Sequence, residues 1–144
     1  MKALVVFDSN LGNTKKIAET IAKELGSDAK AVSVSDYNVK DLEGIELIIA
    51  GSPIIGWKPT EKMDIFLSSL SKDQLKGIKA TSFDTRVKLF IHGDAMGKIA
   101  DKLKNAGAEI TIKPQAFFVH GKDTTILFDG EIEKAAQWAK TINA

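Results

Sequence analysis

The stretch SNLGNTKKIAET, residues 9–20, decides the fold of this 144-residue chain, because it joins an apolar run to a helical pattern. The apolar run ends at Phe7. Apolar residues at helical spacing follow from Ile17 to Leu25, and Gly26 is expected to end the helix. The stretch therefore predicts a short polar loop at a strand-to-helix corner.

This corner has the composition of an anion-binding loop. The first-turn amides of a helix have no intrahelical partner and carry a partial positive charge, so a phosphate can bind there. Side-chain donors and one glycine surround that position, namely Ser9, Asn10, Gly12, Asn13 and Thr14. The loop matches neither a Walker loop nor the G-x-G-x-x-G pattern, which favours a single phosphate over a pyrophosphate. The alternative is that Asn13 or Thr14 only caps the helix.

Outward from this corner, apolar runs alternate with helical patterns along the whole chain. This alternation predicts one α/β domain, residues 1–144, with a parallel sheet covered by helices on both faces. The predicted strands are residues 4–7, 29–34, 47–50, 79–83 and 116–119. The first and third are wholly apolar, as central strands are, and the second alternates, as an edge strand can. With right-handed crossovers, this favours the order 2-1-3-4-5 for a five-stranded sheet.

In a sheet of this order, a ligand binds beyond the carboxyl ends of the strands, where the order reverses between strands one and three. Three loops meet there, residues 8–14, 51–60 and 84–95. The second loop, GSPIIGWKPT, combines apolar side chains, an indole and a flexible glycine, so it could hold a flat aromatic ligand. Alternatively, its two isoleucines lie in the core and Trp57 covers a helix.

The third loop follows the fourth strand directly. Asp84 and Thr85 can hydrogen-bond the edge of a heterocycle, and Arg86 can meet a negative group or lie in solvent. The apolar run at residues 89–91 could belong to the core or form a partner-facing patch.

The composition excludes several classes of function. Apolar residues make up 44% and charged residues 27% of the chain, as in ordinary soluble domains. The absence of cysteine excludes disulfides, thiolate metal sites and cysteine nucleophiles, and two histidines cannot alone build a typical zinc site. The net charge of +1 without a basic stripe argues against nucleic acid. No apolar stretch is long enough to span a membrane, and we expect a cytoplasmic protein.

Four stretches carry a resemblance to the flavodoxin family. VFDSNLGNTKKIAETIA, residues 6–22, resembles the family's phosphate loop, whose usual form is Ser/Thr-x-Thr/Tyr-Gly-Asn-Thr before a helix. GSPIIGW, residues 51–57, resembles the second flavin loop, and SFDTR, residues 82–86, lies where the third belongs. DGEIEKAAQWAKTI, residues 129–142, resembles the final helix of small flavodoxin-domain proteins. The resemblance implies a three-layer flavodoxin-like fold and FMN bound without covalent attachment.

The resemblance also implies a role for each loop, and no catalytic or metal-binding side chain. The residues that would hold the 5′-phosphate are Ser9, Asn10, Leu11, Gly12, Asn13 and Thr14. Those that would lie along the isoalloxazine ring are Ser52, Pro53, Ile54, Ile55, Gly56 and Trp57. Those that would border the pyrimidine end or the ribityl chain are Asp84, Thr85 and Arg86.

The implied function is electron transfer between redox partner proteins through the bound flavin, by a monomer or weak dimer. One alternative is an FMN-dependent NAD(P)H or quinone oxidoreductase, in which Arg86 or His92 would bind substrate. A second is a flavodoxin-like interaction module that has lost FMN and uses Leu89, Phe90 and Ile91. A phospho-signalling receiver domain fits poorly, because no aspartate follows the third strand.

The chain departs from the usual family pattern in two respects. Its single tyrosine, Tyr37, is far in sequence from the third loop, and Ile55 stands where a tryptophan is common, so the ring would be less tightly enclosed. The usual electron carrier is strongly acidic, whereas this chain is nearly neutral.

Overall fold

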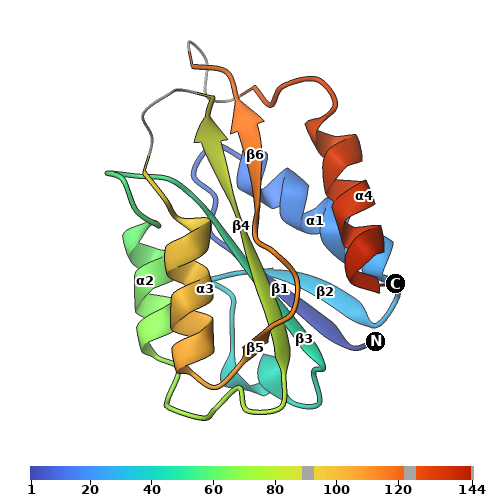
Figure 1. Ribbon diagram of the computed structural model, residues 1–144, viewed down its shortest axis with the longest axis vertical. Helices are drawn as coiled ribbons and strands as arrows, with labels where there is room; N and C mark the ends of the chain where they lie inside the picture. The colour runs from blue at the N-terminus through green and yellow to red at the C-terminus, as the bar shows by residue number, and fades with distance from the viewer. Residues whose placement is uncertain (89–92, 122–125, 144) are drawn as a thin grey trace.

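A single sheet forms the centre of the molecule in the computed structural model, which describes residues 1–88, 93–121 and 126–143. The proposed patch at residues 89–91 and His92 lie outside the described residues. The strands are β1 (Ala3–Phe7), β2 (Ala29–Ser33), β3 (Leu47–Pro53), β4 (Lys79–Val87), β5 (Glu109–Ile110) and β6 (Gln115–Val119). They pair in parallel in the order 2-1-3-4-5, with β6 also beside β4, which confirms the predicted order (Figure 1).

The predicted fifth strand, residues 116–119, corresponds to β6, and the two-residue β5 is a sixth strand that the sequence did not predict. β5 pairs with the first two residues of β4, and β6 pairs with β4 from Phe83 to Val87. Between them, the carbonyl of Ile112 accepts a hydrogen bond from the Thr81 hydroxyl at 2.8 Å in place of a ladder bond. Pro114, which has no N–H to donate, follows in the same interruption.

Four helices cover the two faces of the sheet. They are α1 (Asn13–Leu25), α2 (Glu61–Ser68), α3 (Met96–Asn105) and α4 (Glu131–Asn143), and a short 3₁₀ helix, η1 (Val39–Leu42), precedes β3. α1 and α4 lie on one face, and α2 and α3 lie on the other (Figure 1). Gly26, with φ of 114°, follows the last residue of α1, as predicted.

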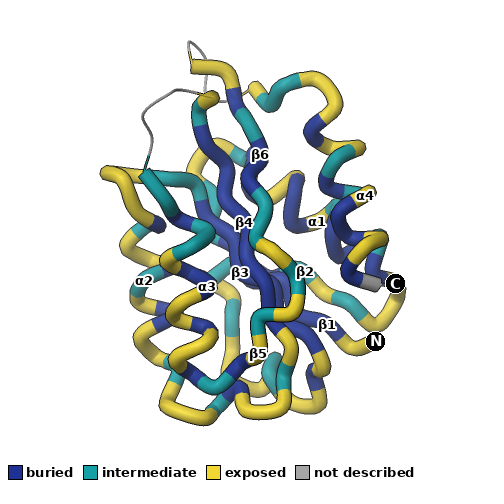
Figure 2. The backbone as a smooth tube through the Cα atoms, in the orientation of Figure 1, coloured by how far each residue is buried: buried dark blue, intermediate teal, exposed yellow. Residues whose placement is uncertain are grey.

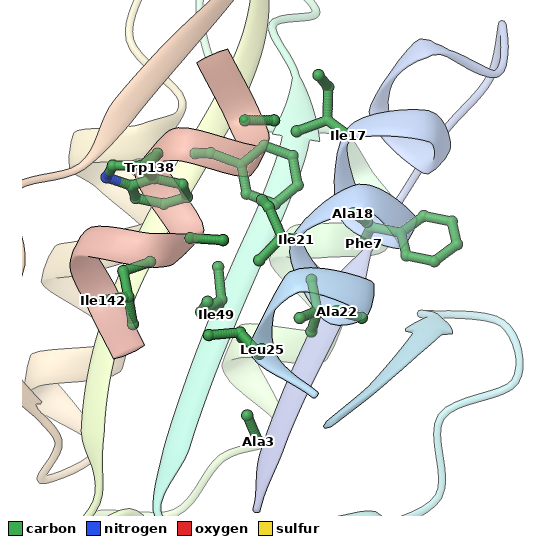
Figure 3. Close-up of a cluster of buried hydrophobic side chains, with 14 of the residues drawn as sticks. Ala3, Phe7, Ile17, Ala18, Ile21, Ala22, Leu25, Ile49, Trp138 and Ile142 are labelled. Carbon is green, nitrogen blue, oxygen red and sulfur yellow. The ribbon is translucent and has the colours of Figure 1, made fainter. Parts of the chain in front are cut away.

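Alternation along the strands divides the core between the two faces. In β1, Val5 and Phe7 pack under α1, whereas Leu4 and Val6 pack under α2 and α3. Every residue of β1 is buried, as expected for a central strand, and the buried tube in Figure 2 follows the sheet through the molecule. On the face that α1 and α4 share, side chains of the two helices point toward one another above the sheet (Figure 3).

Two strands extend beyond their apolar runs. β3 continues to Pro53 and β4 to Val87, because the two remain in register as far as the pair Pro53 and Thr85. Consequently, Ser52 and the three polar residues of the predicted third loop, Asp84 to Arg86, lie in strands and are buried.

Three aromatic rings pack closely in the core between the sheet and the helices α1 and α4. The rings of Phe83, Phe117 and Trp138 meet edge to face, with centroids 6.0–6.4 Å apart. Gly51 in β3 lies directly under the Phe83 ring, and a β-carbon at that position would overlap ring atoms. A side chain at residue 51 is therefore incompatible with this arrangement.

We expect Gly51→Ala to lower the free energy of unfolding by about 1–3 kcal/mol, the usual cost of overpacking a core. The overlapping atoms belong to the distal part of the Phe83 ring, which leucine lacks. The Phe83→Leu, Gly51→Ala double variant should therefore lose less than the sum of the two single losses, as measured by urea denaturation. Additive losses would contradict the contact.

Candidate functional site

A pocket of about 380 Å³ lies beyond the carboxyl ends of β1, β3 and β4. It brings together three segments that are far apart in sequence, with the end of β6 beside them. Its lining residues are Ser9, Asn10, Leu11, Asn13, Thr14, Pro53, Ile54, Ile55, Gly56, Trp57, Thr85, Arg86, Val87, Gly93 and Val119.

The pocket contains all the predicted site residues except three. Gly12 lies beside it in the same loop, and Ser52 and Asp84 are fully buried beneath it. Ser52 positions the second loop, because its hydroxyl accepts the amide of Thr60 at 3.0 Å across the base of the loop. The Thr60 hydroxyl in turn donates to the Asp8 carboxylate at 2.5 Å, which ties the second loop to the first.

The first loop leaves the start of α1 open toward a ligand. Gly12 holds the N-cap position with φ of 93°, a left-handed conformation that favours glycine. Its amide donates to the Ser9 hydroxyl at 3.1 Å, and its carbonyl accepts the amide of Lys16 at 3.1 Å. Since the N-cap residue has no side chain, the alternative that Asn13 or Thr14 caps this helix is wrong.

A pair of buried hydroxyls links the first loop to β4. The Thr14 and Thr85 hydroxyl oxygens are 2.9 Å apart, and both residues line the pocket while being almost fully buried. Each hydroxyl can donate one hydrogen bond and accept others, so the pair can satisfy itself and still serve a ligand.

The second loop ends in a two-residue hairpin. The amide of Ile55 donates to the Lys58 carbonyl at 2.8 Å, and the amide of Lys58 returns a bond to Ile55 at 3.3 Å. The central residues have positive φ, 58° for Gly56 and 72° for Trp57, as in a type I′ turn. Trp57 is 59% exposed and Ile55 48% exposed, so these two side chains do not lie in the core, and only Ile54 is partly packed against it.

The start of α3 holds this turn in place. The Trp57 carbonyl accepts the amide of Asp94 at 3.1 Å and the ammonium of Lys98 at 3.3 Å. Gly93 packs so closely against the Trp57 backbone that a β-carbon would overlap it. A left-handed tryptophan costs about 1–3 kcal/mol of strain, and these contacts from α3 offset it.

The polar end of β4 is occupied by a buried ion pair. The Asp84 carboxylate accepts Nε of Arg86 at 2.8 Å and Nη2 at 2.5 Å, and it also accepts the amide of Met96 at 3.0 Å. The hydrogen bond to this carboxylate, more than any other influence, raises the pKa of the Arg86 guanidinium. Asp84 thus anchors the first turn of α3, and Arg86 borders the pocket with its charge already matched.

Sequence reasoning missed three lining residues. Val87 and Val119 are paired in register at the ends of β4 and β6. Val87 was missed because the predicted fourth strand ended at residue 83, four residues too early. Gly93 matters because it has no side chain, which lets its backbone pack against that of Trp57. No pattern in the sequence around Gly93 predicts this contact.

The strand order, together with an open helix N-terminus facing a partly apolar pocket, defines a nucleotide-binding α/β protein of the flavodoxin-like class. In the part of the chain that the structure describes, none of the helices has the length and apolar character needed to cross a bilayer.

Comparison with known proteins agrees with this class. The flavodoxin domain model matches residues 4–88. An uncharacterized protein of Methanocaldococcus jannaschii is 32% identical over 99% of this chain and 98% of its own length. A flavodoxin of Maridesulfovibrio salexigens is 31% identical over 76% of this chain and 80% of its own. The solved structure of a flavodoxin from the domain Archaea superposes with a TM-score of 0.76 at 24% identity, covering 99% of this chain and 96% of that one.

The chain belongs to the flavodoxin family. Members of this family bind FMN and transfer electrons to redox partner proteins, and FMN is the cofactor of this protein.

We expect Asp84→Asn to cost about 3–5 kcal/mol of stability, because the buried Arg86 guanidinium keeps only the half-exposed Asp94 carboxylate, 3.7 Å away, as a counter-charge. Breaking the surface pair of Lys30 and Asp41 by Lys30→Met is the matched control. Lys30 is 59% exposed, so this change should cost less than about 1 kcal/mol. Equal losses in thermal or urea unfolding would contradict the role assigned to Asp84.

Proposed function

We propose that this protein carries electrons between redox partner proteins in the cytoplasm, as a monomer or weak dimer, through FMN held without a covalent bond in the pocket. One observation carries the proposal: the open N-terminus of α1 and the exposed Trp57 line the same pocket from opposite sides of the strand-order reversal. One end of that pocket suits an anion, and the other suits a flat apolar ring.

The phosphate end is formed by backbone more than by charge. Residues 9–14 supply amides of the loop and of the first helical turn, to which hydroxyls of Ser9 and Thr14 are added. Gly12 adds no side chain to the loop, and its φ of 93° favours glycine at this position. Such a site binds the phosphate tightly without placing a lysine against it.

The ring end is mainly apolar. Leu11, Ile55, Trp57, Val87 and Val119 present hydrocarbon or aromatic surface to the pocket. The Thr85 hydroxyl offers a polar contact at the end of β4, where the edge of a heterocycle would need one. The volume of about 380 Å³ lies within the range usual for sites of small ligands and cofactors.

When bound, FMN supplies the redox chemistry, and the protein supplies its binding and orientation. The loop amides hold the phosphate, the apolar residues exclude water from the ring, and the α3 contacts keep the Trp57 turn in one conformation. Asp84 balances the charge of Arg86. The Arg86 side chain can therefore contact a ligand while the buried pair as a whole stays neutral.

We expect Gly12→Asp to weaken FMN binding by a hundredfold or more, measured by quenching of flavin fluorescence. The new carboxylate would lie near the phosphate, where two unit charges about 4 Å apart repel by about 4 kcal/mol at an effective dielectric of about 20. Gly26→Asp is the matched control, because Gly26 also has positive φ in open space but lies at the opposite end of α1. Riboflavin, which lacks the phosphate, should discriminate little between the two variants. If Gly12→Asp binds FMN normally, the assigned loop is wrong.

A carrier and an oxidoreductase on this fold differ in turnover. We expect the FMN-loaded protein to be reduced and reoxidised reversibly by chemical reagents. With NADH or NADPH and a quinone, it should turn over at least a hundredfold more slowly than the roughly 10 s⁻¹ typical of enzymes. Steady-state turnover near that value would instead support the NAD(P)H or quinone oxidoreductase.

A further inference from the structure

Large apolar side chains are exposed around the mouth of the pocket. Leu11, Ile55 and Trp57 are 49%, 48% and 59% exposed, and all three also line the pocket. A ligand inside would cover only the surfaces that face it. The remaining apolar surface is continuous with the cofactor site, as a surface for electron transfer must be.

Two lysines lie beside the Trp57 turn, and a third follows a strand end that lines the pocket. Lys58 is exposed and directly follows Trp57 in the hairpin, and the Lys98 ammonium is 3.3 Å from the Trp57 carbonyl. Lys88 directly follows the lining residue Val87, and its ammonium lies over the rings of Phe118 and Phe128 at 5.5 and 5.9 Å from their centroids. We call Leu11, Ile55 and Trp57 with these three lysines the rim.

Asp8 and Asp84 next to the rim are held by partners of their own, whereas Asp94 is half exposed and Glu61 is exposed. The Asp94 carboxylate accepts the amide of Gly97 at 2.9 Å and lies 3.7 Å from the Arg86 guanidinium. Asp8 accepts the Thr60 hydroxyl, and Asp84 is buried in its ion pair. Glu61, in the first turn of α2, is exposed. Among the described residues, the three lysines of the rim outnumber these two exposed acids.

We propose that the rim is the docking surface for a redox partner protein that carries acidic residues around its own redox centre. This inference rests on the proposed function and adds the charge of the partner to it. The apolar residues would be covered in the complex, and the lysines would surround them, as in interfaces with an apolar centre and a polar edge. Opposite charges would mainly increase the association rate, and salt would weaken the effect.

The charge of the rim can be measured by comparing the rates of electron transfer from the bound flavin to a small anion and to a small cation. The FMN-loaded protein is reduced and then mixed in a stopped-flow instrument with excess ferricyanide, an anion. Each ferricyanide ion accepts one electron and becomes ferrocyanide, so two ions reoxidise one fully reduced flavin, whose dissociable protons pass to the solvent. Hexaamminecobalt(III), a cation that also accepts one electron, is the second probe.

The rate with ferricyanide should fall as salt is raised from about 10 mM, where the screening length is about 30 Å, to about 1 M. The rate with the cobalt complex should rise or stay constant. In the double variant Lys58→Glu, Lys88→Glu, the ferricyanide rate at low salt should fall about tenfold, at the lower end of reported steering effects. The matched control, Lys72→Glu with Lys140→Glu, changes the net charge equally at exposed positions away from the pocket and should leave both rates within twofold of the unmodified protein.

The two proposals fail in different ways. Each protein is first titrated with FMN, and failure of the unmodified protein to bind FMN contradicts the proposed function. If all of them bind FMN but the two double variants give equal ferricyanide rates, or if the rate of the unmodified protein rises with salt, the rim is not the positive docking surface inferred here.

Discussion

The reversal of strand order between β1 and β3 is the constraint on which the site depends. α1 leaves β1 for one face of the sheet, and α2 leaves β3 for the other, so the loops that follow these neighbouring strands diverge. The carboxyl ends of the central strands therefore lie at the base of a crevice. The pocket occupies this crevice, and α1 directs its N-terminus toward it.

Polar residues buried at the strand ends connect the walls of this crevice to one another. Asp84 in β4 accepts the amide of Met96 and so fixes the start of α3. From the same turn, the amide of Asp94 reaches the Trp57 carbonyl in the second loop. On the opposite face, the hydroxyls of Thr14 and Thr85 join α1 to β4. β4 thus positions both the phosphate end and the ring end of the pocket, although only its last residues line it.

Periodicity was sufficient to predict the strand order, because β1 and β3 are apolar on both faces and β2 is not, but it missed the two-residue β5. It failed at the end of β4, where Asp84 to Arg86 have loop-like composition but stay in the sheet because they pair with β6 and because Asp84 is bonded to Arg86 and to the amide of Met96. Local sequence likewise predicts a turn at Gly56 but cannot predict a left-handed Trp57. That conformation depends on Gly93, which is far away in sequence and contributes by leaving space.

The net charge of +1 describes this surface poorly. Charges buried in pairs, such as Asp84 with Arg86, cancel over a few ångströms and contribute little to the field outside. Exposed charges act over about 8 Å at physiological salt, so those nearest the cofactor determine which partner is attracted. Lys88 and Lys98 are each held at the rim by a specific contact, one to aromatic rings and one to a backbone carbonyl. A nearly neutral chain can therefore carry an excess of lysines beside its cofactor pocket, and in the proposed complex partner choice depends on this local arrangement more than on the total charge.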